Sequence, residues 1–247
     1  MSVDVSRVLL ELAPTGELRV AINLGNPVLA QRNDVSGELT GVSVALAQAL
    51  AVELGVTEKL TTYDAAGKVF AVLDDDLWDL AFLAIEPARA QKIAFSTPYV
   101  IIDGTYLVRE DSRWWTTSDL DEPGTRIAVG QGAAYDLFLS RTLNHATLVR
   151  AATSSGAVAV FLDQKLDAVA GVRQPLEQFA KSQQGLRVLV DSFTEIRQAM
   201  AVPKHRSLAA QYIQDFIERQ VCNGFVAQAL IRSGQPDAQV ASPRRLD

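Results

Sequence analysis

The most informative stretch of the chain is Leu80-Ala-Phe-Leu-Ala-Ile85, which is followed directly by Glu86-Pro-Ala-Arg89. A short apolar run of this kind indicates a strand buried on both faces of a parallel sheet. Proline early in the next segment is typical of a helix start. The same order returns where a strand predicted at 126–129 precedes a Gly-rich loop and a helix at 134–143. Strands that alternate with helices predict an α/β fold.

The remaining predicted elements continue this alternation along the chain. Helices are expected at 5–12, 42–54, 67–73, 156–162, 175–180 and over most of 208–231. Strands are expected at 18–24, 60–63, 99–108, 147–151, 168–172, 186–189 and 197–202. The tail after Gly234 contains two prolines and two arginines, so we expect it to be frayed.

Length and composition exclude several classes of protein. The 247 residues suffice for one or two domains with a buried core. With 48% hydrophobic and 21% charged residues, the composition is that of a globular protein and excludes disorder. A net charge of −6 argues against nucleic acid or an anionic membrane as a partner.

Metal and disulfide chemistry are also unsupported. Cys222 is the single cysteine, and His145 and His205 are the only histidines, so neither an internal disulfide nor a histidine-based zinc site is expected. The acidic run Asp74-Asp75-Asp76 does not converge on one ion and predicts a solvated face. We therefore expect no metal and no cofactor.

No apolar stretch is long enough to span a bilayer, so no membrane insertion is expected. The first residues, Met1-Ser-Val-Asp-Val-Ser-Arg7, lack the basic and apolar regions of a secretory leader. Two interpretations stay open: a leader has been removed, or the protein remains in the cytoplasm.

One block has a specific spacing: Arg89-Ala-Gln-Lys-Ile-Ala-Phe-Ser-Thr-Pro-Tyr99. Four weaker stretches accompany it, Gly16-Glu-Leu-Arg-Val-Ala-Ile, Gly37-Glu-Leu-Thr-Gly-Val-Ser-Val, Ile127-Ala-Val-Gly-Gln-Gly and Leu166-Asp-Ala-Val-Ala. In this order they resemble the type II periplasmic solute-binding proteins, in particular the polar amino-acid group, over nearly the whole chain.

The resemblance implies a two-lobed α/β fold with two crossover hinge strands, at 104–109 and 199–204. Lobe 1 would comprise residues 1–106 and 202–247, and lobe 2 residues 107–201. A small carboxylate-bearing solute would bind in a cleft between lobes that close by hinge motion. It also implies a periplasmic monomer that docks on an ABC permease, with a cytoplasmic location as the alternative.

Arg89 is the first candidate site residue. It follows a buried strand, so its guanidinium can face the cleft, and it can hold a carboxylate in a bidentate fork that lysine cannot copy. In the resembled family this position holds the α-carboxylate of the ligand. The alternative is a solvated helix arginine.

The turn Gly130-Gln131-Gly132-Ala133-Ala134 precedes a predicted helix, so its amides are candidates to hold an anionic ligand. The alternative is a plain strand–helix turn. The turn does not match a dinucleotide fingerprint.

The chain departs from the family at several site positions. Glu86 stands where the family has a small hydroxyl, Val172 where it has the acid that holds an ammonium group, and Asn26 near the place of an aromatic. Either the ligand is not a standard α-amino acid, or Glu86 holds the ammonium; Glu86 can also simply pair with Arg89. Arg173 is a candidate for a second acidic group or a solvated side chain, and Lys68 a weaker candidate at a helix start.

Three functions are compatible with these residues. The one we favour is a non-enzymatic solute-binding protein of an ABC uptake system, with no catalytic residue. The first alternative is an enzyme similar to the cyclohexadienyl and arogenate dehydratases, with Glu86 as general acid and Arg89 as carboxylate anchor. We expect Glu86 to be ionised, which argues against that role. The second alternative is a cytoplasmic ligand sensor.

Overall fold

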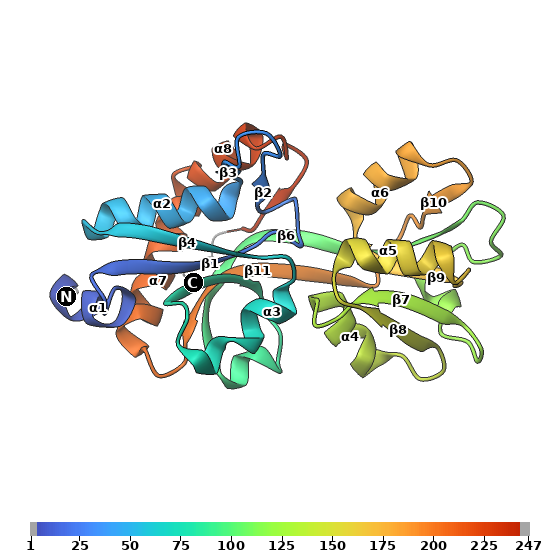
Figure 1. The fold of residues 1–247 in the computed structure, drawn as a ribbon, viewed down its shortest axis with the longest axis horizontal. Helices are drawn as coiled ribbons and strands as arrows, with labels where there is room; N and C mark the ends of the chain where they lie inside the picture. The colour runs from blue at the N-terminus through green and yellow to red at the C-terminus, as the bar shows by residue number, and fades with distance from the viewer. Residues whose placement is uncertain (1–3, 243–247) are drawn as a thin grey trace. The chain divides into compact units, whose positions relative to one another are not determined.

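The computed structural model describes residues 4–242. The chain divides into two compact units (Figure 1). Unit 1 contains Met1–Asp64, Lys68–Ile101 and Arg197–Asp247, and unit 2 contains Ala65–Gly67 and Ile102–Ile196. The boundaries at 101/102 and 196/197 lie inside two long strands, β6 (Ile93–Arg109) and β11 (Thr194–Pro203). Each unit mixes helices and strands, as the sequence predicts.

Unit 1 is built on the strand order β4-β1-β5-β11-β6. Its strands are β1 (Glu17–Asn23), β4 (Thr57–Tyr63), β5 (Leu80–Ala84), β12 (Gln239–Val240) and parts of β6 and β11, with a separate pair β2 (Gln31–Arg32) and β3 (Leu39–Thr40). Its helices are α1 (Val5–Leu12), α2 (Val42–Leu54), α3 (Ala66–Ala71), η1 (Leu73–Asp75), η2 (Arg89–Gln91), α7 (Ser207–Cys222) and α8 (Phe225–Arg232). The first two residues of α3 fall within the 65–67 segment that is grouped with unit 2.

Unit 2 follows the order β6-β9-β7-β8, with β10 paired to β6. Its strands are β7 (Arg126–Gly130), β8 (Thr147–Ala151), β9 (Ala168–Val172) and β10 (Leu186–Val188). Its helices are η3 (Thr117–Leu120), α4 (Ala134–Thr142), α5 (Ser154–Asp163) and α6 (Arg173–Ser182). β6 pairs with strands of both units.

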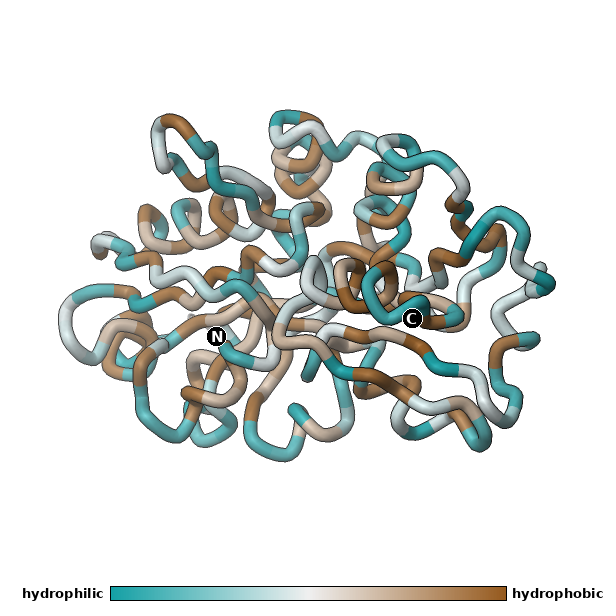
Figure 2. Tube along the Cα trace, turned by 45° about the vertical axis from the view of Figure 1, so that its right-hand side comes forward, coloured by the Kyte–Doolittle hydropathy of each residue, from teal (hydrophilic) through white to brown (hydrophobic). Residues whose placement is uncertain are grey.

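Buried apolar side chains explain why these segments pair. All five residues of β5 are buried, and Trp78 just before it is 1% exposed. In unit 2, Phe161 of α5, Val169 of β9 and Leu107 of β6 belong to one apolar cluster. The hydropathy trace shows apolar segments concentrated in strands and inner helix turns, and hydrophilic segments in many outer loops (Figure 2). Burial of this surface is the main stabilising contribution to each unit.

Two glycines determine where α2 begins and ends. Gly41 precedes the helix with φ +119°, and a Cβ placed there would lie 2.3 Å from the carbonyl oxygen of Leu29. Gly55 ends the helix in the left-handed conformation that favours glycine. The glycine that opens the predicted helix at 42–54 is thus required by a close approach of two backbone segments.

The structure corrects three predictions about elements. The tail is ordered at β12, whose residues Gln239 and Val240 pair with β6; the residues after 242 lie outside the described chain. The segment 208–231 is two helices, because Gly224 adopts φ +81° between them. The predicted strand at 80–85 pairs parallel with β1 but antiparallel with β11, so its sheet is mixed. Within residues 4–242, no helix has the length and apolarity needed to cross a membrane.

Candidate functional site

Arg89 lies in the segment that connects β5 to β6, in unit 1. Its side chain is 1% exposed, and Nη1 donates a hydrogen bond to the carbonyl oxygen of Ala84 at 3.1 Å. Burial lowers the pKa of Arg89 to about 10, while the nearby Glu86 acts in the opposite direction. The guanidinium therefore remains charged at neutral pH, and the alternative of a solvated helix arginine is wrong. Arg89 begins the 3-10 helix η2, the short helix expected after Pro87.

Glu86 is also buried, with 7% of its surface exposed. Its backbone carbonyl accepts a hydrogen bond from the amide of Ala90 at 2.9 Å, which closes the turn that contains Arg89. Glu86 and Arg89 lie on the same turn, and Glu86 acts to raise the pKa of Arg89 against the effect of burial. Because both residues are buried, this pairing differs from the weak surface ion pair considered in the sequence.

Asn26 and Lys68 have local partners in the structure. Asn26 is 6% exposed, and its Oδ1 accepts a hydrogen bond from the amide of Val28 at 3.2 Å, so it fixes the turn after β1. The Lys68 Nζ lies 2.8 Å from a carboxylate oxygen of Asp64, and both side chains are more than half exposed. Their predicted contacts with a ligand remain predictions.

The Gly-rich turn of unit 2 joins β7 to α4. The amide of Gln131 donates to the carbonyl of Ala151 at 2.8 Å, and that of Ala133 to the carbonyl of Gly130 at 3.1 Å. The amide of Gly132 donates to Oδ2 of Asp136 at 2.8 Å. An anion at these three amides would have to displace acceptors that unit 2 itself supplies. Ala134 is the first residue of α4.

Asp136 has further partners that the sequence analysis did not identify. It is 3% exposed, and Nε of Arg150 lies 3.0 Å from its Oδ1. The hydroxyl of Ser140 donates to the same oxygen at 3.3 Å and to the backbone carbonyl of Asp136 at 2.7 Å. An acidic residue in the first turn of a helix is the one signal that could have identified Asp136 in advance. Arg150 comes from β8 and left no such signal.

Arg173 follows β9 and begins α6. Its guanidinium is held inside unit 2, and its side chain is 18% exposed, so the alternative of a solvated side chain is wrong. The acceptors are the carbonyls of Leu189, Val190 and Asp191, the hydroxyl of Ser192 and the carboxylate of Asp103. These bonds fasten the segment after β10 to the start of α6. A contact with a second acidic group of a ligand remains a prediction.

The acidic run at 74–76 is only partly a solvated face. Asp76 accepts from Arg19 at 3.2 Å and from Arg206 at 2.9 Å. The same two arginines bind the fully buried Asp79, at 2.7 and 2.6 Å. This cluster ties β1, the start of β5 and the start of α7 together. Among residues 4–242, no group of histidine, cysteine and acidic side chains is arranged to hold a metal ion.

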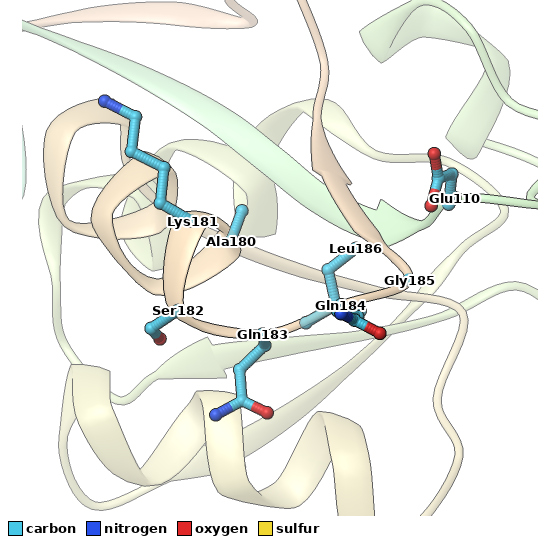
Figure 3. A pocket seen from close by; sticks show the side chains of 8 residues that line it. All are labelled: Glu110, Ala180, Lys181, Ser182, Gln183, Gln184, Gly185 and Leu186. Carbon is cyan, nitrogen blue, oxygen red and sulfur yellow. The ribbon is translucent and has the colours of Figure 1, made fainter.

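A surface hollow of about 820 Å³ lies elsewhere on unit 2 (Figure 3). It is lined by the end of α6, the turn after it and the start of β10, together with Glu110. None of the candidate site residues lines it.

Comparison with known proteins places the chain in a family. Residues 18–230 match the family model of bacterial extracellular solute-binding proteins, family 3. The L-cystine-binding protein TcyJ of Escherichia coli is 32% identical over 132 residues, which are 52% of this chain and 48% of TcyJ. The chain thus spans about half the length of the curated relatives that it matches.

Solved structures show the same fold. An amino acid ABC transporter substrate-binding protein from Streptococcus pneumoniae, bound to L-arginine, has a TM-score of 0.77 at 20% identity, covering 95% of this chain and 99% of its own. An ancestral amino acid-binding protein, a precursor of cyclohexadienyl dehydratase, has a TM-score of 0.75 at 21% identity, covering 91% and 97%. The structures share the two-lobed fold of periplasmic binding proteins, and the chain belongs to the family 3 bacterial extracellular solute-binding proteins.

Proposed function

We propose that this chain is a non-enzymatic binding protein that captures an amino acid or a closely related carboxylate for an ABC permease. The observation that supports this most is Arg89, a charged guanidinium buried at the end of β5 in unit 1. Its relatives support the same function, because TcyJ is an L-cystine-binding protein and the pneumococcal protein is bound to L-arginine. We also propose that it acts outside the cytoplasm as a monomer.

Arg89 is suited to anchor a ligand carboxylate. A guanidinium presents two parallel donors to the two oxygens of a carboxylate, and the low dielectric around a buried group strengthens that attraction. Glu86 places a negative charge beside it. The two residues together match a zwitterion, with the ligand carboxylate at Arg89 and its ammonium group toward Glu86. This arrangement would supply the ammonium partner that Val172 cannot.

Glu86 also supports a second candidate function. The ancestral neighbour is described as a precursor of cyclohexadienyl dehydratase, and a buried acid is the group that such chemistry needs. The family model and the two named relatives that carry a ligand in their description are all binding proteins, which weighs against an enzyme. We therefore propose binding as the function and treat turnover as an outcome of the test.

The lobe limits 1–106 with 202–247 and 107–201 are part of the same proposal, with hinges at 104–109 and 199–204. Asn26, Lys68, Gln131, Gly132, Ala133, Ala134 and Arg173 complete the proposed site. Arg173 and the amides of Gln131, Gly132 and Ala133 rank below Arg89, because each already has partners within unit 2.

The test is a thermal-shift screen with L-cystine, L-cysteine, L-arginine, L-lysine, prephenate and arogenate. At a hundredfold excess over Kd, a bound amino acid should raise the Tm by about 5 to 10 °C. Arg89→Lys should weaken that binding by about 100-fold, because a point charge cannot reproduce the bidentate fork. Arg113→Lys, at an arginine that is 71% exposed, is the matched control and should bind like the parent.

Two results would overturn the proposal. The first is the absence of a thermal shift with every amino acid of the screen and a broader set of the twenty standard ones. The second is formation of an aromatic product from prephenate or arogenate by the parent that disappears in Glu86→Gln, which would establish the dehydratase function instead.

A further inference from the structure

Asp136 is a buried carboxylate of unit 2 in the first turn of α4. We infer that Asp136 is a positioning residue that fills the anion-accepting place of the β7–α4 loop and thereby sets the loop's shape. That this loop contacts a ligand rests on the proposed function. That Asp136 already binds the loop amide does not. The sequence pattern predicts that the amides of this loop bind an anionic ligand.

The contacts of Asp136 come from three directions. From the loop, the amide of Gly132 donates to Oδ2 at 2.8 Å. From β8, the guanidinium of Arg150 donates through Nε to Oδ1 at 3.0 Å and to Oδ2 at 3.3 Å. From the next turn of α4, the hydroxyl of Ser140 donates to Oδ1 at 3.3 Å and accepts from Nη2 of Arg150 at 2.7 Å. The carboxylate is thus enclosed by donors, one of them charged.

The position of Asp136 explains why a carboxylate is favoured there. It lies in the first turn of α4, where the helix dipole and unpaired amides stabilise a negative charge. Gly132 adopts φ +70°, which directs its N–H back toward the helix. The same charge would repel a second anion at this loop.

The orientation of the Gln131–Gly132 peptide limits which chemical group of a ligand this loop can bind. In a planar trans peptide the carbonyl points opposite to the N–H, so the carbonyl of Gln131 points away from Asp136. The Gly132 amide is already used by Asp136, and the carbonyl of Gln131 lies close to the backbone of Gly67. A ligand carboxylate is therefore disfavoured at this loop, which agrees with Arg89 as its proposed anchor.

Chemical rescue tests this inference without knowledge of the ligand. Asp136→Ala removes the carboxylate and leaves its three donors in place, and sodium formate is small enough to replace it. We expect formate to raise the Tm of Asp136→Ala by several degrees more than sodium chloride at equal ionic strength. The amide resonance of Gly132 should move upfield in the variant and return toward the parent position on addition of formate.

Three comparisons make the result specific. In the parent, formate should leave the Gly132 resonance unchanged, because Asp136 holds the position. Asp136→Asn keeps a carbonyl acceptor and leaves no space, so it should fold and show no response to formate. Asp136→Ala/Arg150→Met lacks the cation and should not be rescued.

Several outcomes would overturn the inference. They are an equal response of parent and Asp136→Ala to formate, a response of Asp136→Asn as large as that of Asp136→Ala, and no effect of formate on a folded Asp136→Ala. Where Asp136→Ala does not fold in chloride, refolding is attempted in formate. Recovery of folded protein supports the inference, and failure to recover it while Asp136→Asn folds counts against it. None of these results depends on whether the protein binds an amino acid.

Discussion

The β5–η2 segment of unit 1 and the β7–α4 loop of unit 2 bury charges of opposite sign. In the β5–η2 segment the most deeply buried charged residue is Arg89, and the acid Glu86, also buried, lies three residues before it. In unit 2 the buried charge is the anion Asp136, and its cation, Arg150, comes from the neighbouring strand β8. Each unit thus balances its buried charge by a different route.

Glu86 and Arg89 are a local pair on one segment, whereas Asp136 and Arg150 are brought together by the fold. Two charges on one short segment can rearrange together when a ligand arrives, so Arg89 can exchange one anionic neighbour for another. A carboxylate held between a helix, a loop and a strand has to break contacts with all three. Unit 1 is therefore the place where we expect a ligand charge to be accepted, and unit 2 the place where shape is fixed.

The largest effect should come from removing the cation of unit 1. Arg89→Met leaves Glu86 buried without that positive charge, which should lower the free energy of unfolding by about 3 to 5 kcal/mol. Adding Glu86→Gln should restore part of the loss, with a coupling of at least about 1 kcal/mol. Urea unfolding of the parent, both single variants and the double variant measures this cycle.

The cycle also has an outcome that breaks the comparison. If the two substitutions are additive, the charges of Glu86 and Arg89 are not coupled, and the local pair of unit 1 does not exist. The same four proteins report function, because both variants with Met at position 89 should lose the carboxylate anchor.

A smaller effect is expected at Arg173, the arginine that follows β9 as Arg89 follows β5. Arg173→Lys removes the fork that binds the carbonyls of Leu189, Val190 and Asp191. The free energy of unfolding should fall by about 1 to 3 kcal/mol, since these three carbonyls lose a charged donor. Calorimetry with the best amino acid of the screen should show a loss of affinity far smaller than that of Arg89→Lys, about threefold or less.

Arg113→Lys, at an exposed arginine that pairs with Glu122 and lies outside the proposed site, is the matched control for this replacement. A tenfold loss of affinity in Arg173→Lys at unchanged stability would favour the alternative in which Arg173 binds a second acidic group. The two arginines would then have the same role, and the contrast between the units would disappear.

The sequence predicts contacts between residues that are close along the chain better than contacts between distant residues. The strand before Arg89, the helix after the Gly-rich turn and the strand at 168–172 follow from local patterns of apolar residues and glycine. Glu86 and Arg89 are predictable neighbours because Arg89 follows Glu86 by three positions. The amide of Gly132 was assigned to a ligand, although an acid four residues later lies one helical turn away and competes for it.

Contacts between distant segments cannot be predicted from the local pattern of residue types. Arg206 binds Asp79 across 127 residues, and Arg173 reaches a loop that follows another strand. The pairing of β12 with β6 was missed because Pro236 and the polar residues around it indicate a frayed tail. Each of these contacts is set by the order of strands in the sheet, which a single sequence does not specify.

The smallest expected effect concerns Asp121, a second carboxylate of unit 2 that holds backbone amides. Burial alone would raise the pKa of Asp121, but hydrogen bonds from the amides of Ala146, Asn144 and His145 lower it from 3.8 to about 2. Because the unfolded chain takes up the proton first, this carboxylate stabilises the fold fully above pH 4 and loses its effect as the pH falls toward 2. The difference in unfolding free energy between the parent and Asp121→Asn should therefore shrink over that interval, by at most about 1 kcal/mol after solvent screening. Urea unfolding of both proteins at several pH values measures it, and amino-acid affinity at pH 7 should be unchanged. If the difference in unfolding free energy stays constant from pH 5 to pH 2, the three amides do not stabilise the charge of Asp121. If Asp121→Asn loses affinity for the amino acid, Asp121 as well as Asp136 shapes the part of unit 2 that is proposed to contact the ligand.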